Sequence, residues 1–227
     1  MTVTAILPIP VGLAQRREAV FAPVAGQSPL VSIVRTLMSV GDVVVAPAAP
    51  FADEVRESLT RQGLSPVQVR VAEEPGERAH CVAAGLRALG EVPTGPVLLH
   101  DIAWPLIAPA TLDRVAAALR GGARAVLPIC PVTDSIKAVD PEGAVTATVD
   151  RAPLRTVQYP RGFDGEVLSM LVARSAVDEF DDLDAALAAK VSVTLVDGET
   201  DTVRIQLPGD ADYLAAVITS RRAGSGR

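Results

Sequence analysis

The chain has 227 residues, enough for one large α/β domain or two small ones. Hydrophobic residues make up 49% of it and the mean hydropathy is +0.32, which excludes general disorder, yet no apolar stretch approaches the ~18 residues of a membrane span. The net charge of −6 argues against a sequence-independent nucleic-acid binder. Cys81 and Cys130 lie in apolar surroundings without metal-ligand spacing, so we expect reduced core thiols in a cytoplasmic protein.

Strands and helices alternate along the first 128 residues. We expect strands at residues 2–8, 42–46, 67–71, 96–100 and 123–128. Helices are predicted at residues 30–37 behind a Ser-Pro cap, and at 50–62, 77–89 and 108–119. The residues between the first strand and the first helix, 8–26, are expected to form a long loop. This alternation predicts a three-layer αβα fold with a mainly parallel, Rossmann-like sheet.

The pattern changes after residue 131. Two β-rich runs, 135–140 and 144–149, are joined by Pro141-Glu142-Gly143, which is typical of a hairpin. Because a lone hairpin cannot bury a face, we expect residues 132–160 or so to project as an arm that embraces a second subunit. The rest of the chain predicts helices at 164–175, 181–190 and 210–219, a strand at 191–196, an extended piece at 202–207 and a frayed tail at 221–227. No linker divides the chain, so residues 1–220 are expected to form a single domain.

One strand ends in a candidate ligand site. The run VLLHDIAWP, from Val97, ends in Asp101, and ligands of open α/β sheets sit outside the carboxyl ends of the strands. An acid there can hold a divalent metal on a phosphate, or a ribose hydroxyl. It can equally do no more than cap the following turn. The chain's two histidines, His80 and His100, have no acid–base or metal partner at motif spacing and are interpreted as structural.

Several segments together resemble the 2-C-methyl-D-erythritol 4-phosphate cytidylyltransferase family. They are GERAHCVAAGLRAL from Gly76, VLLHDIAWP, PVTDSIKAVD from Pro131, TVDRAPLRTVQYPRGF from Thr148 and VTLVDGETDTVRIQLPGDADYLAA from Val193. The resemblance implies a fold of the nucleotide-diphospho-sugar transferase type and a homodimer formed through the β-arm. It also implies transfer of CMP from CTP to a sugar-alcohol phosphate, with Mg²⁺ or a similar cation and release of pyrophosphate, in the non-mevalonate route of isoprenoid biosynthesis.

The resemblance also assigns site residues. Arg16 and Arg17 are the candidates to replace the cations that hold the triphosphate in the family, with solvated loop residues as the alternative. The resemblance implies that Arg151 and Arg204 hold the acceptor, and that Asp101 binds the metal. The residues that it places around the nucleotide are Pro8, Ile9, Pro10, Gly12, Gly76, Arg78, Cys81, Asp101 and Ile102.

The sequence departs from the family in its phosphate loop. In PIPVGLAQRREAVF only Gly12 is left of the glycines, and the family's lysine position falls near Ala19. Trp104 replaces an arginine, Tyr159 a threonine and Cys81 a serine. Two alternatives therefore stay open: an impaired or non-catalytic relative that acts as a ligand- or protein-binding dimer, and nucleotidyl transfer to another phosphorylated acceptor.

Overall fold

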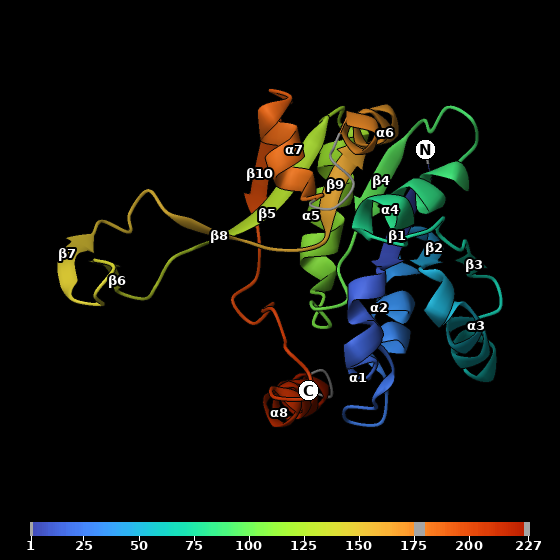
Figure 1. The fold of residues 1–227 in the computed structure, drawn as a ribbon, viewed down its shortest axis with the longest axis horizontal. Helices are drawn as coiled ribbons and strands as arrows, with labels where there is room; N and C mark the ends of the chain where they lie inside the picture. Colours follow the sequence, from blue (N-terminus) through green and yellow to red (C-terminus); the bar gives the residue numbers. More distant parts are fainter. Residues whose placement is uncertain (1, 175–179, 225–227) are drawn as a thin grey trace.

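The computed structural model describes residues 2–174 and 180–224 (Figure 1). Its strands are β1 (Val3–Ile9), β2 (Gly41–Pro47), β3 (Gln68–Val69), β4 (Pro96–Leu99), β5 (Ala125–Pro131), β6 (Ile136–Val139), β7 (Val145–Val149), β8 (Arg155–Val157), β9 (Arg161–Asp164) and β10 (Val193–Asp197). Its α-helices are α1 (Glu18–Phe21), α2 (Pro29–Leu37), α3 (Ala52–Arg61), α4 (Arg78–Arg87), α5 (Pro109–Arg120), α6 (Gly165–Arg174), α7 (Asp182–Ala188) and α8 (Ala211–Gly224). Two 3₁₀ helices are η1 (Val11–Arg16) and η2 (Ala49–Phe51). None of the described helices is both long and apolar enough to span a bilayer.

The main sheet has the strand order β10-β5-β9-β4-β1-β2-β3. The strand β1 pairs in parallel with β2 and β4, and β10 pairs in parallel with β5. Only β9, between β4 and β5, and β8, beside β5, run antiparallel to their neighbours. The mainly parallel α/β fold predicted from the sequence is confirmed, but β8 and β9 were not predicted. The run at residues 161–164 is too short to distinguish from the start of the following helix by periodicity.

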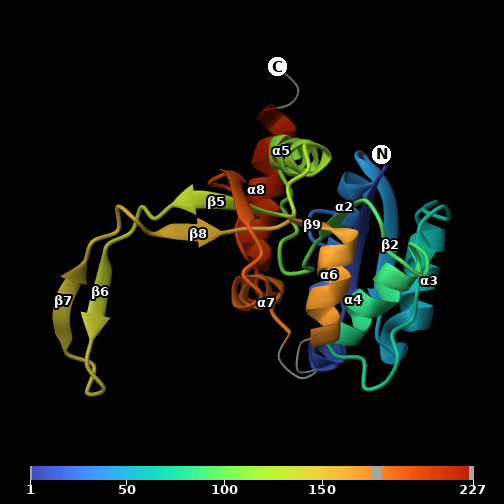
Figure 2. The ribbon, with the colours of Figure 1, turned by 90° about the horizontal axis from the view of Figure 1, so that it is seen from above.

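Helices cover both faces of the sheet (Figure 2). A Cβ added at Gly85 of α4 would lie 2.4 Å from a methyl of Ile6, and one added at Gly162 of β9 would lie 2.7 Å from a methyl of Val115 in α5. Ile6 pairs with Leu99 of β4, whereas Gly162 pairs with Leu98, the next residue along the same strand. Because successive residues of a strand face opposite sides of the sheet, α4 and α5 lie on opposite faces. Glycine at these two positions lets each helix pack closely against the strands.

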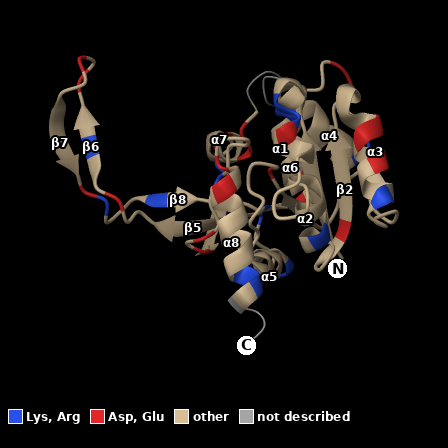
Figure 3. Cartoon of the chain, turned by 90° about the horizontal axis from the view of Figure 1, so that it is seen from below, with Lys and Arg blue, Asp and Glu red and all other residues tan. Residues whose placement is uncertain are grey.

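The β-arm projects from the body as a two-stranded ribbon of β6 and β7 (Figure 1). All of β7 is exposed, and Val139 and Val145 keep 60% and 66% of their surface accessible. Basic and acidic residues both lie along this arm and its root (Figure 3). The hairpin predicted at residues 135–149 is thus confirmed, and none of the residues of β6 and β7 is fully buried within its own chain.

The prediction of a long loop at residues 8–26 is wrong. The strand β1 extends to Ile9, and the residues after it form η1 and α1 instead of an open loop. Phe21 packs at 6.2 Å from the ring centroid of Phe51, and Val24 joins Leu214 of α8 in a second small apolar cluster. These apolar contacts fold the segment against the body, which the sequence pattern did not indicate.

Candidate functional site

A pocket of about 140 Å³ lies beside the carboxyl ends of β1 and β4. Its walls come from η1, the turn after β4 and the segment that precedes α8. Six of the predicted site residues line it: Pro8, Pro10, Arg16, Asp101, Ile102 and Arg204. Both arginines are exposed, and neither has an ion-pair partner among the residues that the structure describes. Two unpaired cations facing one pocket favour an anionic ligand.

The segment that carries Arg204 is fixed to the rest of the site by hydrogen bonds. The backbone N–H of Ile205 donates to the carbonyl of Ala103, in the turn after β4, at 2.8 Å. The buried side-chain amide of Gln158 donates to the carbonyls of Glu199 and Thr202, at 2.8 and 2.7 Å. These bonds hold a stretch with no regular secondary structure at a defined place beside Asp101.

The 3₁₀ helix η1 uses its first backbone donors inside the protein. The N–H of Val11 donates to the carbonyl of Gly76 at 2.9 Å, and that of Leu13 to the carbonyl of Pro10 at 3.1 Å. Pro10 itself has no N–H. Little of the backbone here is therefore free to hold phosphate, which leaves the side chain of Arg16 as the group that η1 presents to the pocket.

Arg17 points away from this pocket. It forms an ion pair with Glu54 of α3 and donates to the carbonyl of Pro50 at 3.3 Å. Its guanidinium lies 4.9 Å from the ring centroid of Phe51, within the range of a cation–π contact. The structure therefore separates the two adjacent arginines, with Arg16 on the pocket and Arg17 against α3.

Gly76 and Cys81 lie next to the start of η1, where Gly76 accepts a hydrogen bond from Val11. Gly76 has a φ of +80°, and a Cβ there would lie 2.7 Å from that of Ala48, so glycine is required both by conformation and by space. The Cys81 thiol lies 3.6 Å from the carbonyl of Gly76. Burial raises the pKa of Cys81 to about 12, so the group is a protonated thiol and not a nucleophile.

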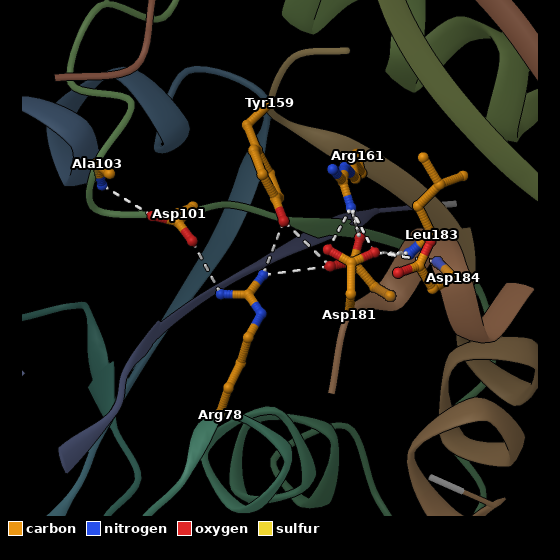
Figure 4. Close-up of polar contacts among 9 residues, drawn as sticks. Arg78, Asp101, Ala103, Tyr159, Arg161, Asp181, Leu183 and Asp184 are labelled. Atoms are coloured by element: carbon orange, nitrogen blue, oxygen red, sulfur yellow. Dashed lines mark hydrogen bonds and ion pairs between the residues drawn. The ribbon is translucent and has the colours of Figure 1, made fainter. Parts of the chain in front are cut away.

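Arg78, at the start of α4, is the centre of a largely buried charge cluster that contains Asp101, Tyr159 and Arg161 (Figure 4) and also Asp182. We call these five residues the Arg78 cluster. The Arg78 guanidinium donates to Asp101 Oδ2 at 3.1 Å, to Tyr159 Oη at 3.0 Å and to Asp182 Oδ1 at 3.3 Å. The Tyr159 hydroxyl donates to Asp182 Oδ1 at 3.0 Å, and Arg161 Nη1 donates to Asp182 Oδ2 at 2.9 Å. Four separate segments of the chain thus meet through one set of charges.

The surroundings of the Arg78 cluster fix its protonation states. Burial raises the pKa of Tyr159, and the adjacent Asp182 carboxylate raises it further, so the phenol stays neutral. Burial works against the charged form of Arg78, but Tyr159, Asp182 and Asp101 outweigh it and raise the pKa of Arg78 above its usual value. The pKa of Arg161 is raised in the same way, chiefly by Asp182. Both guanidinium groups are therefore permanent positive charges.

The carboxylate of Asp101 interacts with two groups among the residues that the structure describes. Its Oδ1 accepts a hydrogen bond from the backbone N–H of Ala103 at 2.8 Å, which caps the turn after β4, and its Oδ2 is paired with Arg78. Its side chain is 29% exposed and lies on the pocket. The turn-capping role considered from the sequence is present, together with a position from which the carboxylate can reach a ligand.

Arg151 lies on the arm, away from the pocket of its own chain. It is exposed and donates to the carbonyl of Thr133 near the root of the arm. His100 is fully buried, and its Nε2 donates to the carbonyl of Trp104 at 2.9 Å. Burial lowers the pKa of His100 to about 4, so the ring is neutral at pH 7, which agrees with the structural role predicted for it.

Comparison with known proteins identifies the family. Residues 12–220 match the 2-C-methyl-D-erythritol 4-phosphate cytidylyltransferase family. The chain belongs to this family. It is 36% identical to the cytidylyltransferase of that name from Rhodococcus opacus over 92% of this chain and 90% of the relative, and 37% identical to that from Nocardia farcinica over 94% and 90%. The crystal structure of the Thermus thermophilus cytidylyltransferase superimposes with a TM-score of 0.75 at 27% identity, over 96% of this chain and all of that one.

In this member of the cytidylyltransferase family, the residues that line the pocket fit a metal ion that is bound partly by substrate. No group of three or more His, Cys, Asp or Glu side chains that could hold a metal occurs in the described part of the chain. Mg²⁺, however, is commonly bound by one or two carboxylates together with substrate phosphates and water. Asp101 on a pocket lined by Arg16 and Arg204 fits such a substrate-bridged ion, and does not fit a metal held by protein alone.

Sequence reasoning missed Arg161 and Asp182 as parts of the site. Tyr159 was recognised only as a departure from the family, not as a member of a cluster. The available signal was the Asp181-Asp182 pair before a predicted helix, where acids favour the first turn. That signal predicts a solvated cap, and Asp181 does accept from the N–H groups of Leu183 and Asp184, whereas Asp182 is turned inward and fully buried.

Proposed function

We propose that this protein transfers CMP from CTP to 2-C-methyl-D-erythritol 4-phosphate, with release of pyrophosphate, in isoprenoid biosynthesis by the non-mevalonate route. Membership of the family supports the reaction. The observation that carries the assignment to this pocket is the convergence of Arg16, Arg204 and Asp101 on one cavity at the carboxyl ends of the strands. Two cations and one carboxylate are suited to two phosphorylated substrates with a divalent ion between them.

In the reaction, a phosphate oxygen of the acceptor forms a bond to the α-phosphorus of CTP. The bond from that phosphorus to the oxygen bridging to the β-phosphate breaks, and its electron pair leaves with pyrophosphate. Phosphoryl-type transfer depends on positioning and charge stabilisation more than on an acid or base. Arg16 holds the triphosphate and stabilises the charge that develops on pyrophosphate, and Arg204 holds the phosphate of the acceptor.

Asp101 is the group that would hold the metal on the α-phosphate. A bound Mg²⁺ supplies charge neutralisation to the transferring group. Asp101 is kept in place for this by the N–H of Ala103 and by the guanidinium of Arg78. Around the nucleoside we propose Pro8, Ile9, Pro10, Gly12 and Ile102 together with Gly76, Arg78 and Cys81, with Arg17 acting through the fold of the segment that carries Arg16.

We further propose a homodimer formed through the β-arm. The arm exposes Val139, Val145 and Leu154 and buries no face within its own chain. Arg151, exposed on this arm, would join Arg204 at the acceptor's phosphate once the arm lies against a second copy. We propose a single catalytic domain over residues 1–220, and a cytoplasmic location consistent with the two free buried thiols.

Calorimetry tests the nucleotide part of this proposal. CTP is titrated with Mg²⁺ into the wild type, Arg16→Ala and Asp101→Ala, and into Arg56→Ala as a control, since Arg56 is an exposed arginine paired with Asp53 on α3. We expect micromolar binding by the wild type and the control, and at least tenfold weaker binding by the other two. Wild-type protein that gives no heat up to millimolar CTP would overturn the enzyme assignment and favour the non-catalytic dimer.

Turnover tests the acceptor. Pyrophosphate release is measured with CTP and 2-C-methyl-D-erythritol 4-phosphate, and Arg204→Ala is expected to raise the KM for the acceptor while leaving CTP affinity unchanged. Binding of CTP without turnover of this acceptor would instead point to another phosphorylated substrate, for which Trp104 and Tyr159 near the site are the relevant departures from the family.

A further inference from the structure

Asp101 already has a positive charge beside it. Arg78 Nη1 lies 3.1 Å from Asp101 Oδ2, and the side chains of Arg78 and Asp101 are 18% and 29% exposed. The other carboxylate oxygen accepts from a backbone N–H. Both carboxylate oxygens of Asp101 thus have a donor within the protein, and one of these donors is a cation.

Arg78 is held in this position by anchors on the side away from Asp101. Asp182 is fully buried and Tyr159 is 7% exposed, and both accept hydrogen bonds from the same nitrogen, Arg78 Nη2. Arg161 fixes these anchors in turn, by its bond to Asp182 and by lying 4.4 Å from the ring centroid of Tyr159. Moving Arg78 off Asp101 would break a buried, hydrogen-bonded network, which is strongly unfavourable.

Negative charge around the Arg78 cluster exceeds positive charge by only one. Two guanidinium groups face the carboxylates of Asp101 and Asp182, Tyr159 is neutral, and Asp181 lies 3.4 Å from Arg161 at the edge of the cluster. A free divalent cation at Asp101 would leave the cluster with an uncompensated positive charge in a partly buried place. A cation that arrives on a triphosphate brings several negative charges with it and does not have this cost.

We propose that Arg78 is a built-in counter-cation of Asp101, which makes binding of a divalent ion at Asp101 depend on the nucleotide. The ion does not bind appreciably to the free protein and enters with the triphosphate. This assigns Arg78 a role toward Asp101 that is separate from any contact of Arg78 with the nucleotide. The inference uses the metal position of the proposed function, but it concerns the protein without nucleotide.

Binding of Mn²⁺ to the nucleotide-free protein tests this role. The fraction of free Mn²⁺ is followed by electron paramagnetic resonance, with the emission of Trp104, the chain's single tryptophan, as a second signal from the turn that carries Asp101. We expect Arg78→Gln to bind Mn²⁺ at least tenfold more tightly than the wild type. Arg78→Lys, which keeps the charge, is expected to stay as weak as the wild type, and the double variant Arg78→Gln with Asp101→Asn is expected to lose the gain.

Tyr159→Phe separates charge from loosening of the cluster. This variant removes one hydroxyl from the network and leaves both charges of the Arg78–Asp101 pair, so its Mn²⁺ binding should stay weak. Equal gains in Tyr159→Phe and Arg78→Gln would overturn the proposal, as would tight Mn²⁺ binding by the wild type or unchanged binding by folded Arg78→Gln. Because no nucleotide is present, these results are distinguishable from a failure of the wild type to bind CTP.

Discussion

The burial of the His100 ring predicts that the folded protein loses stability in acid. The side chain lies at the end of β4 with no accessible surface, and its Nδ1 has no hydrogen-bond partner among the described residues. Its Nε2 donates to a backbone carbonyl, which fixes the neutral tautomer. Burial, with a smaller effect of the nearby Arg78 charge, lowers the pKa of the ring from 6.5 to about 4.

The direction of the effect follows from proton uptake. In the unfolded chain His100 takes up a proton near pH 6.5, whereas in the folded protein it does so only near pH 4. Between these values the unfolded state binds more protons, so the free energy of unfolding falls as the pH falls. At about 1.4 kcal/mol per pH unit, the interval corresponds to a loss of roughly 3 kcal/mol from this residue alone.

Urea unfolding of the wild type and of His100→Gln, followed by Trp104 fluorescence between pH 7 and pH 4, measures this loss. Glutamine keeps an N–H donor near the Trp104 carbonyl and removes the titration. The wild type should lose about 3 kcal/mol more than the variant across the interval, because the other acid-sensitive groups are common to both. Parallel pH profiles for the two proteins would refute the assignment of a lowered pKa to His100.

Three further predictions rest on packing and on the arm. Arg17→Ala should lower the free energy of unfolding in urea by about 1 kcal/mol, because the variant loses a half-exposed ion pair and a cation–π contact. An unchanged free energy of unfolding would contradict the role of Arg17 in packing against α3. Gly85→Ala should lower the free energy of unfolding by about 1–3 kcal/mol, because the new Cβ would lie 2.4 Å from a methyl of Ile6. An unchanged free energy of unfolding would show that α4 can move away from the sheet. Val145→Asp should shift the protein toward monomer in sedimentation velocity, whereas an unchanged mass would show that this face of the arm is not in the interface.

Periodicity and turn residues were sufficient to predict most of the elements, because buried parallel strands and amphipathic helices carry strong local patterns. They failed where tertiary contacts decide the conformation. Nothing local indicates that Val11 would donate to the distant Gly76, which turns the expected loop into η1. Likewise, Arg161 lies between Pro160 and Gly162, where the sequence gives no sign of burial, and becomes a buried strand residue because Asp182 is present to neutralise it.

The candidate site likewise contains one part that could be predicted from the sequence and one part that could not. The position of Asp101 could be predicted, since a strand that ends in an acid places that acid at the ligand edge of the sheet. The different directions of Arg16 and Arg17 could not, because the two are adjacent in sequence and equal in chemistry. Their separation depends on the turn of η1 and on Glu54 and Phe51, two groups on another part of the chain that only the fold brings close.

The altered phosphate segment changes the kind of recognition that this family member can use. Where glycines expose backbone N–H groups, a triphosphate is bound by neutral donors at fixed positions. Here Val11 and Leu13 use theirs within the protein, so the proposed binding of the triphosphate would depend on the side chain of Arg16 and on charges around it. A guanidinium can contact two phosphate oxygens at once, which a lysine cannot, and this offsets part of the missing backbone contact. Under the proposed function, recognition of the triphosphate would therefore depend more on charged side chains than on the backbone, and Arg16, Arg204 and the Arg78–Asp101 pair would act together in it.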